Sequence, residues 1–381
     1  MHGMTIDYHR QPFLVVWETT QACDLACIHC RASAQPNSVP GELTHAEGLT
    51  LIEQVADLGT PVLVFSGGDP LKRPDLCDLI RHGKRRRLRV GTIPAATPRL
   101  TQDVVRELKA AGLDQMALSL DASTAEAHDR FRGVPGAFAK TMEAAQWAHT
   151  EHLPLQINTV FSEHNGDDVD RLIALVRNLG VVFWEVFFLV PTGRGALIPG
   201  LTAEQYEAIF AKLYRVAKYA PFIVKVTEAP HFRRYCIQQQ MREAGIDPAH
   251  VRWHGTELPP ELRQLAGPHG SIGMAPGVNA GKGFVFVSST GEVYPSGFLP
   301  VSVGNVRSAS LKLLYQEALV FRDLRDPDIL EGRCGRCEFR VLCGGSRSRA
   351  YAATGDYLAE EPCCIYEPAL QEDIGPMGGV P

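Results

Sequence analysis

The sequence predicts an α/β fold in which parallel strands form a sheet and helices pack outside it. Short runs rich in Val, Ile, Leu and Phe alternate with amphipathic stretches, and the repeat is about 30 residues long, as in βα units. In addition, most cysteines gather near the two ends of the chain. We therefore expect a sheet that curves as a partial barrel, followed by a cysteine-rich α+β extension.

Six short runs are the expected strands, because they have the length and apolar content of strands buried on both faces. Six strands with their helices correspond to a partial (β/α)6 barrel, and the pattern leaves open whether the ring closes. The strands are expected at Phe13–Glu18, Val62–Phe65, Arg89–Thr92, Gln115–Leu120, Leu155–Phe161 and Trp184–Val190.

Five amphipathic stretches between these strands are the expected helices. The first has a capping box, because Thr44 precedes it and Glu47 follows three residues later. Gly59, Gly112 and Gly180 follow helical stretches, where a left-handed residue ends a helix. The helices are expected at His45–Leu58, Pro74–Arg85, Thr101–Ala111, Ala137–His152 and Asp167–Leu179.

The second half of the chain has a different character, with one clear helix at Leu201–Tyr219. Residues 229–283 show no period, and we interpret them as a long connection or as part of a lid over the substrate. Phe284–Val287 and Glu292–Pro295, joined by a Ser-Thr-Gly turn, predict a β-hairpin. The expected organisation is a core domain at 12–200, a connecting region at 201–283 and a cysteine-rich domain at 284–381.

Composition and charge exclude several classes of protein. The chain has 381 residues, 45% of them hydrophobic, so it can bury a core and is not mainly disordered. Its net charge of -5 argues against general nucleic-acid binding, which needs a basic surface. No apolar run is long enough to span a membrane, and the first residues lack the pattern of a signal peptide. We therefore expect a cytoplasmic protein with reduced thiols.

The cysteines form two clusters, which in a reducing compartment predict metal sites. Cys77 and Cys236 stand alone among the ten cysteines. The first cluster is Cys23, Cys27 and Cys30, and the second is Cys334, Cys337, Cys343, Cys363 and Cys364.

The first cluster directly follows the first strand, at the end where α/β sheets carry their active sites. Three thiolates can bind three irons of a 4Fe–4S cluster and leave the fourth iron open to a ligand. The alternatives are three buried thiols, or a zinc site completed by a residue from elsewhere.

The spacing Cys23-x3-Cys27-x2-Cys30 resembles the CxxxCxxC motif of the radical S-adenosylmethionine (SAM) superfamily. The resemblance implies that the open iron binds the amino and carboxylate groups of SAM. One electron from the cluster would cleave the sulfonium, and the resulting 5′-deoxyadenosyl radical would remove a hydrogen atom from the substrate. His29 matches the position that packs near the adenine.

Further motifs match the superfamily in order and spacing. The turn Ser66-Gly67-Gly68-Asp69 is similar to the family's GGE-type motif, whose backbone meets the amino group of SAM, with Asp in place of the commoner Glu. Other matches end the fourth, fifth and sixth strands, and the last of these would suit the ligand carboxylate. These implied SAM contacts are Ser119, Asp121, Asn158 and Arg194.

The second cluster supplies four thiolates, which suit a second 4Fe–4S cluster or a zinc ion. Its spacing resembles the outer auxiliary cluster of SPASM or twitch extensions, with Cys334, Cys337, Cys343 and Cys364 as ligands and Cys363 as the alternative fourth ligand. Ser296 and Ser346 stand where that family often carries the cysteines of an inner cluster. We therefore expect one auxiliary cluster, which relays electrons, supports the fold, or does both.

Three segments, 131–138, 189–195 and 344–357, resemble the branch that contains heme b synthase and the heme d1 side-chain enzyme. This resemblance implies a tetrapyrrole substrate whose propionates undergo oxidative decarboxylation, iron-coproporphyrin III in heme b synthase. Modification of a ribosomal peptide or another small metabolite is the alternative, and a non-catalytic iron–sulfur or zinc protein is a third. Flavodoxin or ferredoxin would supply electrons. The charge for a porphyrin could come from Arg233, Arg234, Arg347 and Arg349, with His231, Tyr235 and Tyr351 beside it.

Overall fold

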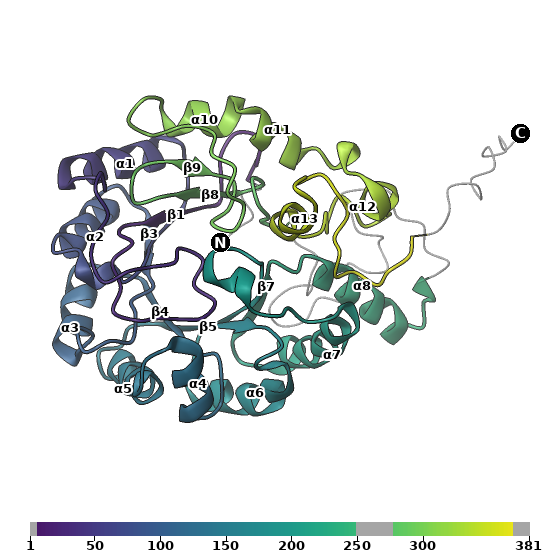
Figure 1. The fold of residues 1–381 in the computed structure, drawn as a ribbon, viewed down its shortest axis with the longest axis horizontal. Helices are drawn as coiled ribbons and strands as arrows, with labels where there is room; N and C mark the ends of the chain where they lie inside the picture. Colours follow the sequence, from purple (N-terminus) through teal and green to yellow (C-terminus); the bar gives the residue numbers. More distant parts are fainter. Residues whose placement is uncertain (1–5, 249–276, 369–381) are drawn as a thin grey trace, which may run out of the picture.

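The computed structural model describes residues 6–248 and 277–368, which build one nine-stranded sheet in the order β7-β6-β5-β4-β3-β2-β1-β8-β9. Figure 1 shows the strands as an open ring with helices around the outside. The strands are β1 (Leu14–Glu18), β2 (Val62–Ser66), β3 (Arg89–Thr92), β4 (Gln115–Ser119), β5 (Leu155–Phe161), β6 (Phe183–Phe188), β7 (Ile223–Thr227), β8 (Phe284–Val287) and β9 (Val293–Tyr294).

Strands β1 to β6 are parallel and neighbour one another in chain order, which confirms the predicted partial barrel. Their carboxyl ends therefore meet at one edge, where loops can share a site. The observed strand ends differ from prediction mainly at β6, which stops at Phe188. Leu189 and Val190 remain buried beyond it. Their apolar character reflects burial in a loop rather than a continuing strand.

The helices of the barrel lie where the apolar periodicity predicts them. Thr44 and Glu47 form the expected capping box at the start of α1. Gly59, Gly112 and Gly180 follow helices with positive φ, as a left-handed end requires. The helices are α1 (His45–Asp57), α2 (Leu76–Arg85), α3 (Gln102–Ala110), α5 (Ala137–Thr150), α6 (Val169–Asn178) and α7 (Ala203–Tyr219).

Before residue 249, two helices and one strand were not predicted, namely α4 (Ala125–Arg132), α8 (His231–Glu243) and β7; α10 to α13, between residues 311 and 354, were not predicted either. Residues 231–243 form a helix within the region expected to be a connection, although their sequence shows no clear period; residues 249–276 lie outside the described part. Helix α8 buries polar residues such as Gln238 beside apolar ones such as Ile237, so the sequence shows no polar face. Strand β7 extends the sheet beyond β6 in parallel.

The C-terminal part continues the same sheet. Strand β8 pairs in parallel with β1, and β9 turns back antiparallel to β8, which confirms the predicted hairpin. The sheet thus crosses residues 200 and 283, where the sequence suggests boundaries. Figure 1 shows α12 and α13 beside α8. The remaining helices are α10 (Leu311–Glu317), α11 (Leu319–Arg325), α12 (Gly332–Arg336) and α13 (Arg347–Thr354), with 3-10 turns η1 (Pro70–Lys72), η2 (Gly166–Asp168), η3 (Gly193–Leu197) and η5 (Pro327–Ile329).

The two edges of the sheet, β7 and β9, are joined by one buried carboxylate. Glu228 directly follows β7 and accepts a hydrogen bond from Ser296 Oγ, 3.2 Å away and two residues past β9. Ser346 and Ser348, at the start of α13, donate to the same carboxylate. We call Glu228, Ser296, Ser346 and Ser348 the Glu228 clasp. Two of its serines are those that stand at the expected cysteine positions of an inner cluster.

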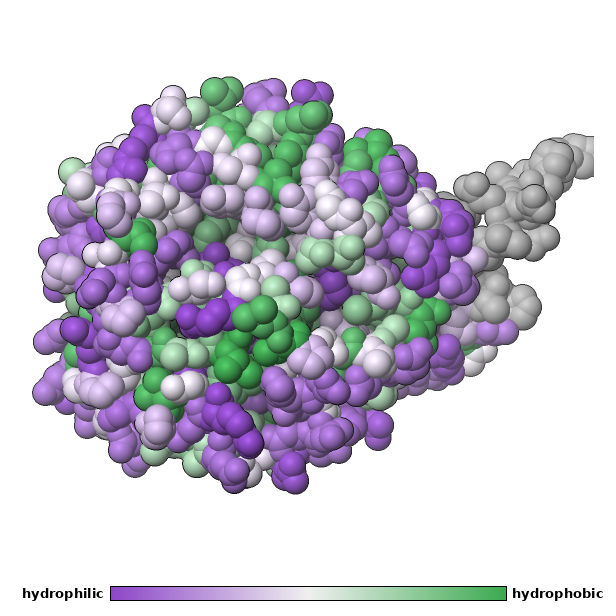
Figure 2. All heavy atoms as spheres, viewed as in Figure 1, coloured by the Kyte–Doolittle hydropathy of each residue, from purple (hydrophilic) through white to green (hydrophobic). Residues whose placement is uncertain are grey.

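The surface is mainly polar. Figure 2 shows hydrophilic residues over most of the visible face, with hydrophobic residues in small groups, one of them near its middle. Among residues 6–248 and 277–368, no helix is long and apolar enough to cross a membrane.

Candidate functional site

A cavity of about 230 Å³ opens at the carboxyl ends of the barrel strands. We call it the first cavity. Most of the residues predicted to bind a cluster or SAM line it, although they come from five separate segments in or directly after β1, β2, β4, β5 and β6. These are Cys23, Cys27, His29, Cys30, Ser66, Gly67, Gly68, Ser119, Asn158 and Arg194. Asp69 and Asp121 do not line the cavity.

The three cysteines of the first cavity receive hydrogen bonds from the protein. The backbone N–H of Leu25 donates to Cys23 Sγ and that of Ala34 to Cys30 Sγ, both at 3.4 Å. Burial raises the pKa of Cys23 to about 12, so its thiol stays protonated unless a metal replaces the proton. Burial thus keeps the free Cys23 thiol from acting as a nucleophile.

Arg194 fixes the cysteine loop from inside. Its Nε donates to the carbonyl of Cys27 at 2.8 Å and its Nη1 to that of Ala34 at 3.0 Å. The third nitrogen, Nη2, is buried and has no partner among the described residues. One N–H group of a guanidinium in the cavity wall is therefore left for a ligand.

His29 lies in the same wall, stacked on Phe131 with ring centroids 4.3 Å apart. Burial lowers its pKa to about 3, and the nearby Arg132 adds to this, so the ring is neutral. Its Nδ1 has no partner among the described residues. A flat, neutral ring with a spare polar atom suits contact with an aromatic base.

The Gly67–Gly68 turn requires glycine at its first position. Gly67 has φ +143°, and a Cβ there would lie 2.4 Å from the carbonyl oxygen of Thr20. The Asp69 carboxylate holds the turn, because it accepts from Leu71 N at 3.1 Å and Ala95 N at 3.2 Å. Asp69 therefore shapes the backbone of the motif and does not itself reach the cavity.

Asp121 also acts indirectly, through other residues. Its buried carboxylate pairs with Arg132 and accepts from Val160 N at 2.8 Å. Arg132 in turn donates from Nη1 to Cys27 Sγ at 3.7 Å. Burial opposes both charges, but mutual attraction lowers the pKa of Asp121 and raises that of Arg132. Arg132 was missed from the sequence, although it lies in a segment noted for its family resemblance, because nothing in the pattern marks it as buried.

The first cavity also carries a cation beside aromatic rings, a grouping that no sequence pattern indicates. Arg31 is paired with Glu18 at 2.6 Å and lies 4.4 Å above the ring of Phe286. Phe187 and Phe298 line the cavity near it, with centroids 6.3 Å apart. Arg31 keeps 25% of its side chain exposed, unlike the buried Arg132. It is the cavity arginine best able to meet a ligand.

A second cavity gathers four of the five C-terminal cysteines, Cys334, Cys337, Cys343 and Cys364. Cys363 does not line it and instead contacts Tyr206. Glu361 N donates to Cys334 Sγ at 3.3 Å and Gly345 N to Cys343 Sγ at 3.4 Å. Burial raises the pKa of Cys337 to about 12, as it does for Cys23.

Of the four arginines considered for a porphyrin, Arg234 lines the second cavity and none lines the first. Arg233 donates to the carbonyl of Leu342 at 3.0 Å, and Arg234 pairs with Glu207. His231 lines the second cavity, with both ring nitrogens buried and without a partner among the described residues. None of these residues, nor Tyr235 or Tyr351, lines the first cavity, and their contact with a porphyrin stays a prediction.

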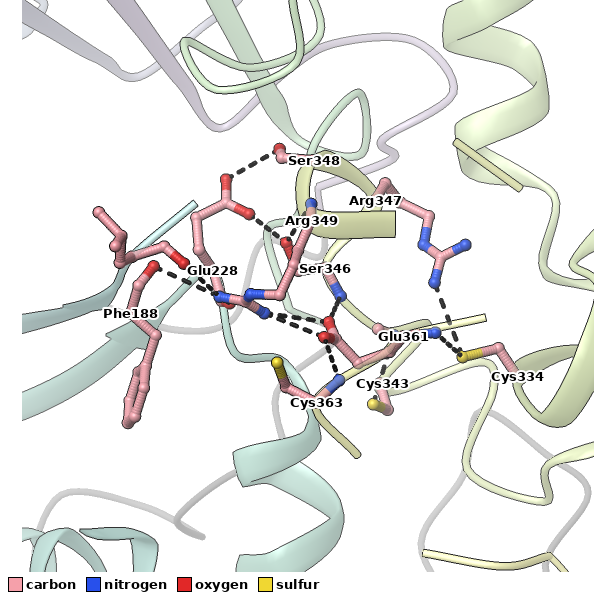
Figure 3. A network of polar contacts seen from close by, with 12 residues as sticks. Phe188, Glu228, Cys334, Cys343, Ser346, Arg347, Ser348, Arg349, Glu361 and Cys363 are labelled. Carbon is pink, nitrogen blue, oxygen red and sulfur yellow. Dashed lines mark hydrogen bonds and ion pairs between the residues drawn. The ribbon is translucent and has the colours of Figure 1, made fainter. Parts of the chain in front are cut away.

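Arg349 links the two cavities (Figure 3). Its Nη1 pairs with Glu361 at 3.1 Å, and its Nη2 donates to the carbonyls of Glu228 at 2.6 Å and Leu189 at 3.3 Å. Leu189 lines the first cavity, and Glu361 lines the second.

Comparison with known proteins gives one family and several relatives. The model of the radical SAM superfamily matches residues 17–176. An AdoMet-dependent heme synthase of Methanosarcina barkeri is 42% identical over 94% of this chain and 97% of its own length. A pre-heme d1 synthase of Dinoroseobacter shibae is 27% identical over 92% of this chain and 85% of its own. A PqqA peptide cyclase of Rhizobium meliloti is 27% identical over 94% and 88%.

Solved structures share the fold. SuiB of Streptococcus suis bound to S-adenosylmethionine has a TM-score of 0.69 at 14% identity, over 94% of this chain and 78% of that one. The anSMEcpe structure with bound AdoMet has a TM-score of 0.64 at 17% identity, over 93% and 90%.

Proposed function

Since the chain belongs to the radical SAM superfamily, we propose that it converts propionate side chains of an iron-coproporphyrin to vinyl groups. As a member of this superfamily it is an enzyme that uses SAM and a 4Fe–4S cluster. The substrate proposal rests on one observation above all, the 42% identity to an AdoMet-dependent heme synthase over 97% of that protein.

Cys23, Cys27 and Cys30 would hold the SAM-binding cluster. Three cysteines with backbone donors on two of them fit a cluster with one open iron. The spare Nη2 of Arg194 and Nδ1 of His29 fit a ligand that carries a carboxylate and an aromatic base. When bound, the cluster and SAM supply the 5′-deoxyadenosyl radical. The chain orients SAM through Ser66, Gly67, Gly68, Ser119, Asn158 and Arg194, while Asp69 and Asp121 hold those contacts in place.

Cys334, Cys337, Cys343 and Cys364 would hold a second 4Fe–4S cluster. A zinc ion needs its four ligands within about 2.3 Å of one point. In residues 6–248 and 277–368, no three His, Cys, Asp or Glu side chains converge to hold a single metal ion. A cluster holds its thiolates farther apart, because each thiolate binds a different iron. The four cysteines line one cavity, which supports a shared metal site, and we assign a cluster to it.

Arg31 would bind a carboxylate of the tetrapyrrole, with Phe187 and Phe298 against its apolar face. From each propionate, one hydrogen atom goes to the 5′-deoxyadenosyl radical, the carboxylate leaves as carbon dioxide, and one electron is released as the vinyl double bond forms. Flavodoxin or ferredoxin would supply the electrons that cleave SAM.

The test is anaerobic turnover of the reconstituted enzyme with dithionite, SAM and iron-coproporphyrin III. We expect 5′-deoxyadenosine together with porphyrin products that have lost one and two molecules of carbon dioxide, detected by mass spectrometry. Formation of 5′-deoxyadenosine without any change of the porphyrin would refute the substrate and favour a peptide or another metabolite. Absence of both would refute the assignment of the first cavity.

Iron analysis tests the two clusters independently of the substrate. Two 4Fe–4S clusters require about eight irons per chain, and replacing Cys23, Cys27 and Cys30 with Ala should leave about four. Retention of all eight in that variant would contradict the ligand assignment.

A further inference from the structure

We propose that Arg347 raises the reduction potential of the C-terminal cluster above that of the SAM-binding cluster, so that the C-terminal cluster can accept the electron that the substrate releases. This inference rests on the proposed function, because it requires a 4Fe–4S cluster at Cys334, Cys337, Cys343 and Cys364. It assigns to Arg347 a tuning role rather than contact with substrate.

Each cysteine site has one buried arginine on one of its sulfurs. Arg132 Nη1 lies 3.7 Å from Cys27 Sγ, and Arg347 Nη2 lies 3.6 Å from Cys334 Sγ. Figure 3 shows the second contact, with the Arg347 guanidinium directed at the sulfur. The two sites are thus alike in their nearest cation, and the comparison turns on what balances that cation.

The two arginines differ in their other partners. Arg132 forms an ion pair with Asp121, whose side chain is fully buried. Arg347 is 2% exposed, and its remaining hydrogen bonds go to the carbonyls of Tyr357 at 2.9 Å and Ala359 at 2.7 Å. No carboxylate in residues 6–248 and 277–368 pairs with it. A full positive charge is therefore buried beside the C-terminal site.

Some of the other charges near that site are paired. Glu361 pairs with Arg349, and Arg333 pairs with Glu360 and Glu367. Arg233 and Glu338, which lie near Cys343 and Cys337, form no ion pair among the described residues and have opposite signs. Arg347 is the unpaired charge that contacts a ligand sulfur directly. Glu361 approaches Cys334 through its backbone N–H, which is a donor and acts in the same direction as Arg347.

A reduced cluster carries one more negative charge than an oxidised cluster, so a buried cation and N–H donors on its sulfurs stabilise the reduced form. Low dielectric strengthens this effect, and an adjacent carboxylate cancels most of it. The Asp121–Arg132 pair leaves the first cluster strongly reducing, as cleavage of SAM demands. Arg347 raises the reduction potential of the second cluster. The electron from each decarboxylation would reduce this 4Fe–4S cluster by one electron, which balances the step.

The experiment is a redox titration monitored by electron paramagnetic resonance. The parent protein is the full-length chain with Cys23, Cys27 and Cys30 replaced by Ala. In this protein only the C-terminal cluster is observed. R347Q removes the charge and keeps an N–H donor. We expect it to shift the reduction equilibrium toward the oxidised cluster by about tenfold, which is about 59 mV for one electron. R347K should shift it less. The control R130Q, which removes an exposed arginine of α4, should shift it little.

The outcomes separate this inference from the proposed function. If the parent variant binds no iron, the proposed second cluster is wrong and the inference falls with it. If parent and R347Q both hold about four irons at the same potential, Arg347 has no tuning role, and the proposed function stands.

A second variant tests the same inference if R347Q fails to bind the C-terminal cluster. D121N removes the balancing charge at the first site, in protein whose four C-terminal ligand cysteines are Ala. We expect the potential of the SAM-binding cluster to rise, and an unchanged potential would overturn the inference even if R347Q could not be studied.

Discussion

Two adjacent cysteines show how sharply a single side chain direction decides function. Cys364 lines the second cavity, whereas the thiol of Cys363 contacts Tyr206 and its backbone N–H donates to Glu361 at 3.1 Å. The sequence context favours Cys364 and leaves Cys363 as the alternative, because spacing alone does not define the direction of each side chain.

We therefore predict opposite results for the two serine substitutions. C364S should lose about four irons per chain, because it removes a ligand of the second cluster. C363S, its matched control one residue away, should retain about eight. Iron analysis and optical spectra of the reconstituted proteins measure this, and equal iron loss in both variants would contradict the assignment of Cys364.

Arg31 offers a second prediction at this scale. Loss of a charge-assisted hydrogen bond to a carboxylate costs about 1.5–3 kcal/mol, so R31Q should raise the KM for iron-coproporphyrin III by about tenfold or more. SAM cleavage should continue, with 5′-deoxyadenosine formed in excess over decarboxylated product. R31K should recover part of the affinity, and R130Q, on the exposed face of α4, should behave like wild type. A normal KM in R31Q would rule out Arg31 as the carboxylate partner.

At the level of elements, two sets of contacts stabilise the first turn of α1, and Glu47 takes part in both. Glu47 completes the capping box with Thr44 and also pairs with Arg307 at 2.6 Å. Arg307 belongs to the loop after β9 and also donates to the carbonyl of Thr290 at 2.9 Å. The start of one helix is thereby tied to a segment 260 residues away in the chain.

This arrangement predicts a pH dependence. The hydrogen bonds from Arg307, and then those from Thr44, lower the pKa of Glu47 from 4.5 to about 2. A carboxylate with a lowered pKa stabilises the fold above its unfolded value, and the contribution is lost as pH falls through the folded value. E47Q should therefore lower the Tm at pH 7, and its difference from wild type should shrink as pH falls below 4.5.

Differential scanning calorimetry at several pH values measures this difference. E126Q is the matched control, because Glu126 also lies in the first turn of a helix but its i,i+4 pair with Arg130 is exposed. Such a pair contributes about 0.5 kcal/mol or less. A pH-independent difference for E47Q would show that the ion pair does not stabilise the fold.

The elements that the sequence predicts well are those with one face in the core and one in solvent. Periodicity reports that contrast directly, so α1 begins at the predicted residue and β5 matches at both ends. Helix α8 lacks the contrast, because Arg234 and Gln238 are buried and satisfy each other at 3.0 Å. Burial of paired polar groups removes the signal on which the prediction depends.

The residues of the candidate site were also predictable only in part. Residues that act through the backbone or a thiol, such as Gly67 and Cys27, belong to spaced motifs and line the first cavity. Arg31 and Arg132 do not follow from spacing, because their roles come from partners far along the chain. Arg132 meets Cys27 across 105 residues, which no local pattern encodes.

For the whole molecule, the Glu228 clasp is the feature that closes the ring. Glu228 has φ +58°, a backbone conformation that non-glycine residues adopt at a cost of about 1–3 kcal/mol. Three serine hydroxyl groups satisfy its buried carboxylate. Serines at positions expected to carry cluster ligands thus hold a carboxylate between the two sheet edges.

E228Q should lower the stability by about 1–3 kcal/mol, because its amide presents a donor to hydroxyl groups that already donate. We expect a lower Tm and faster proteolysis of residues beyond β9. S302A, on the exposed Ser302–Glu292 contact, should change neither. A double-mutant cycle of E228Q and S346A should give non-additive changes in the free energy of unfolding. Additive changes would mean that the clasp does not act as a unit.

The clasp also sets the order in which the protein can be completed. Ser346 leaves the ribosome 118 residues after Glu228, whereas all three N-terminal cysteines have emerged long before either. During synthesis the first strands can pair while the gap between the outermost strands is still open. The contact between the two sheet edges through Glu228 and Ser346 therefore forms only after Ser346, at the start of α13, has been synthesised.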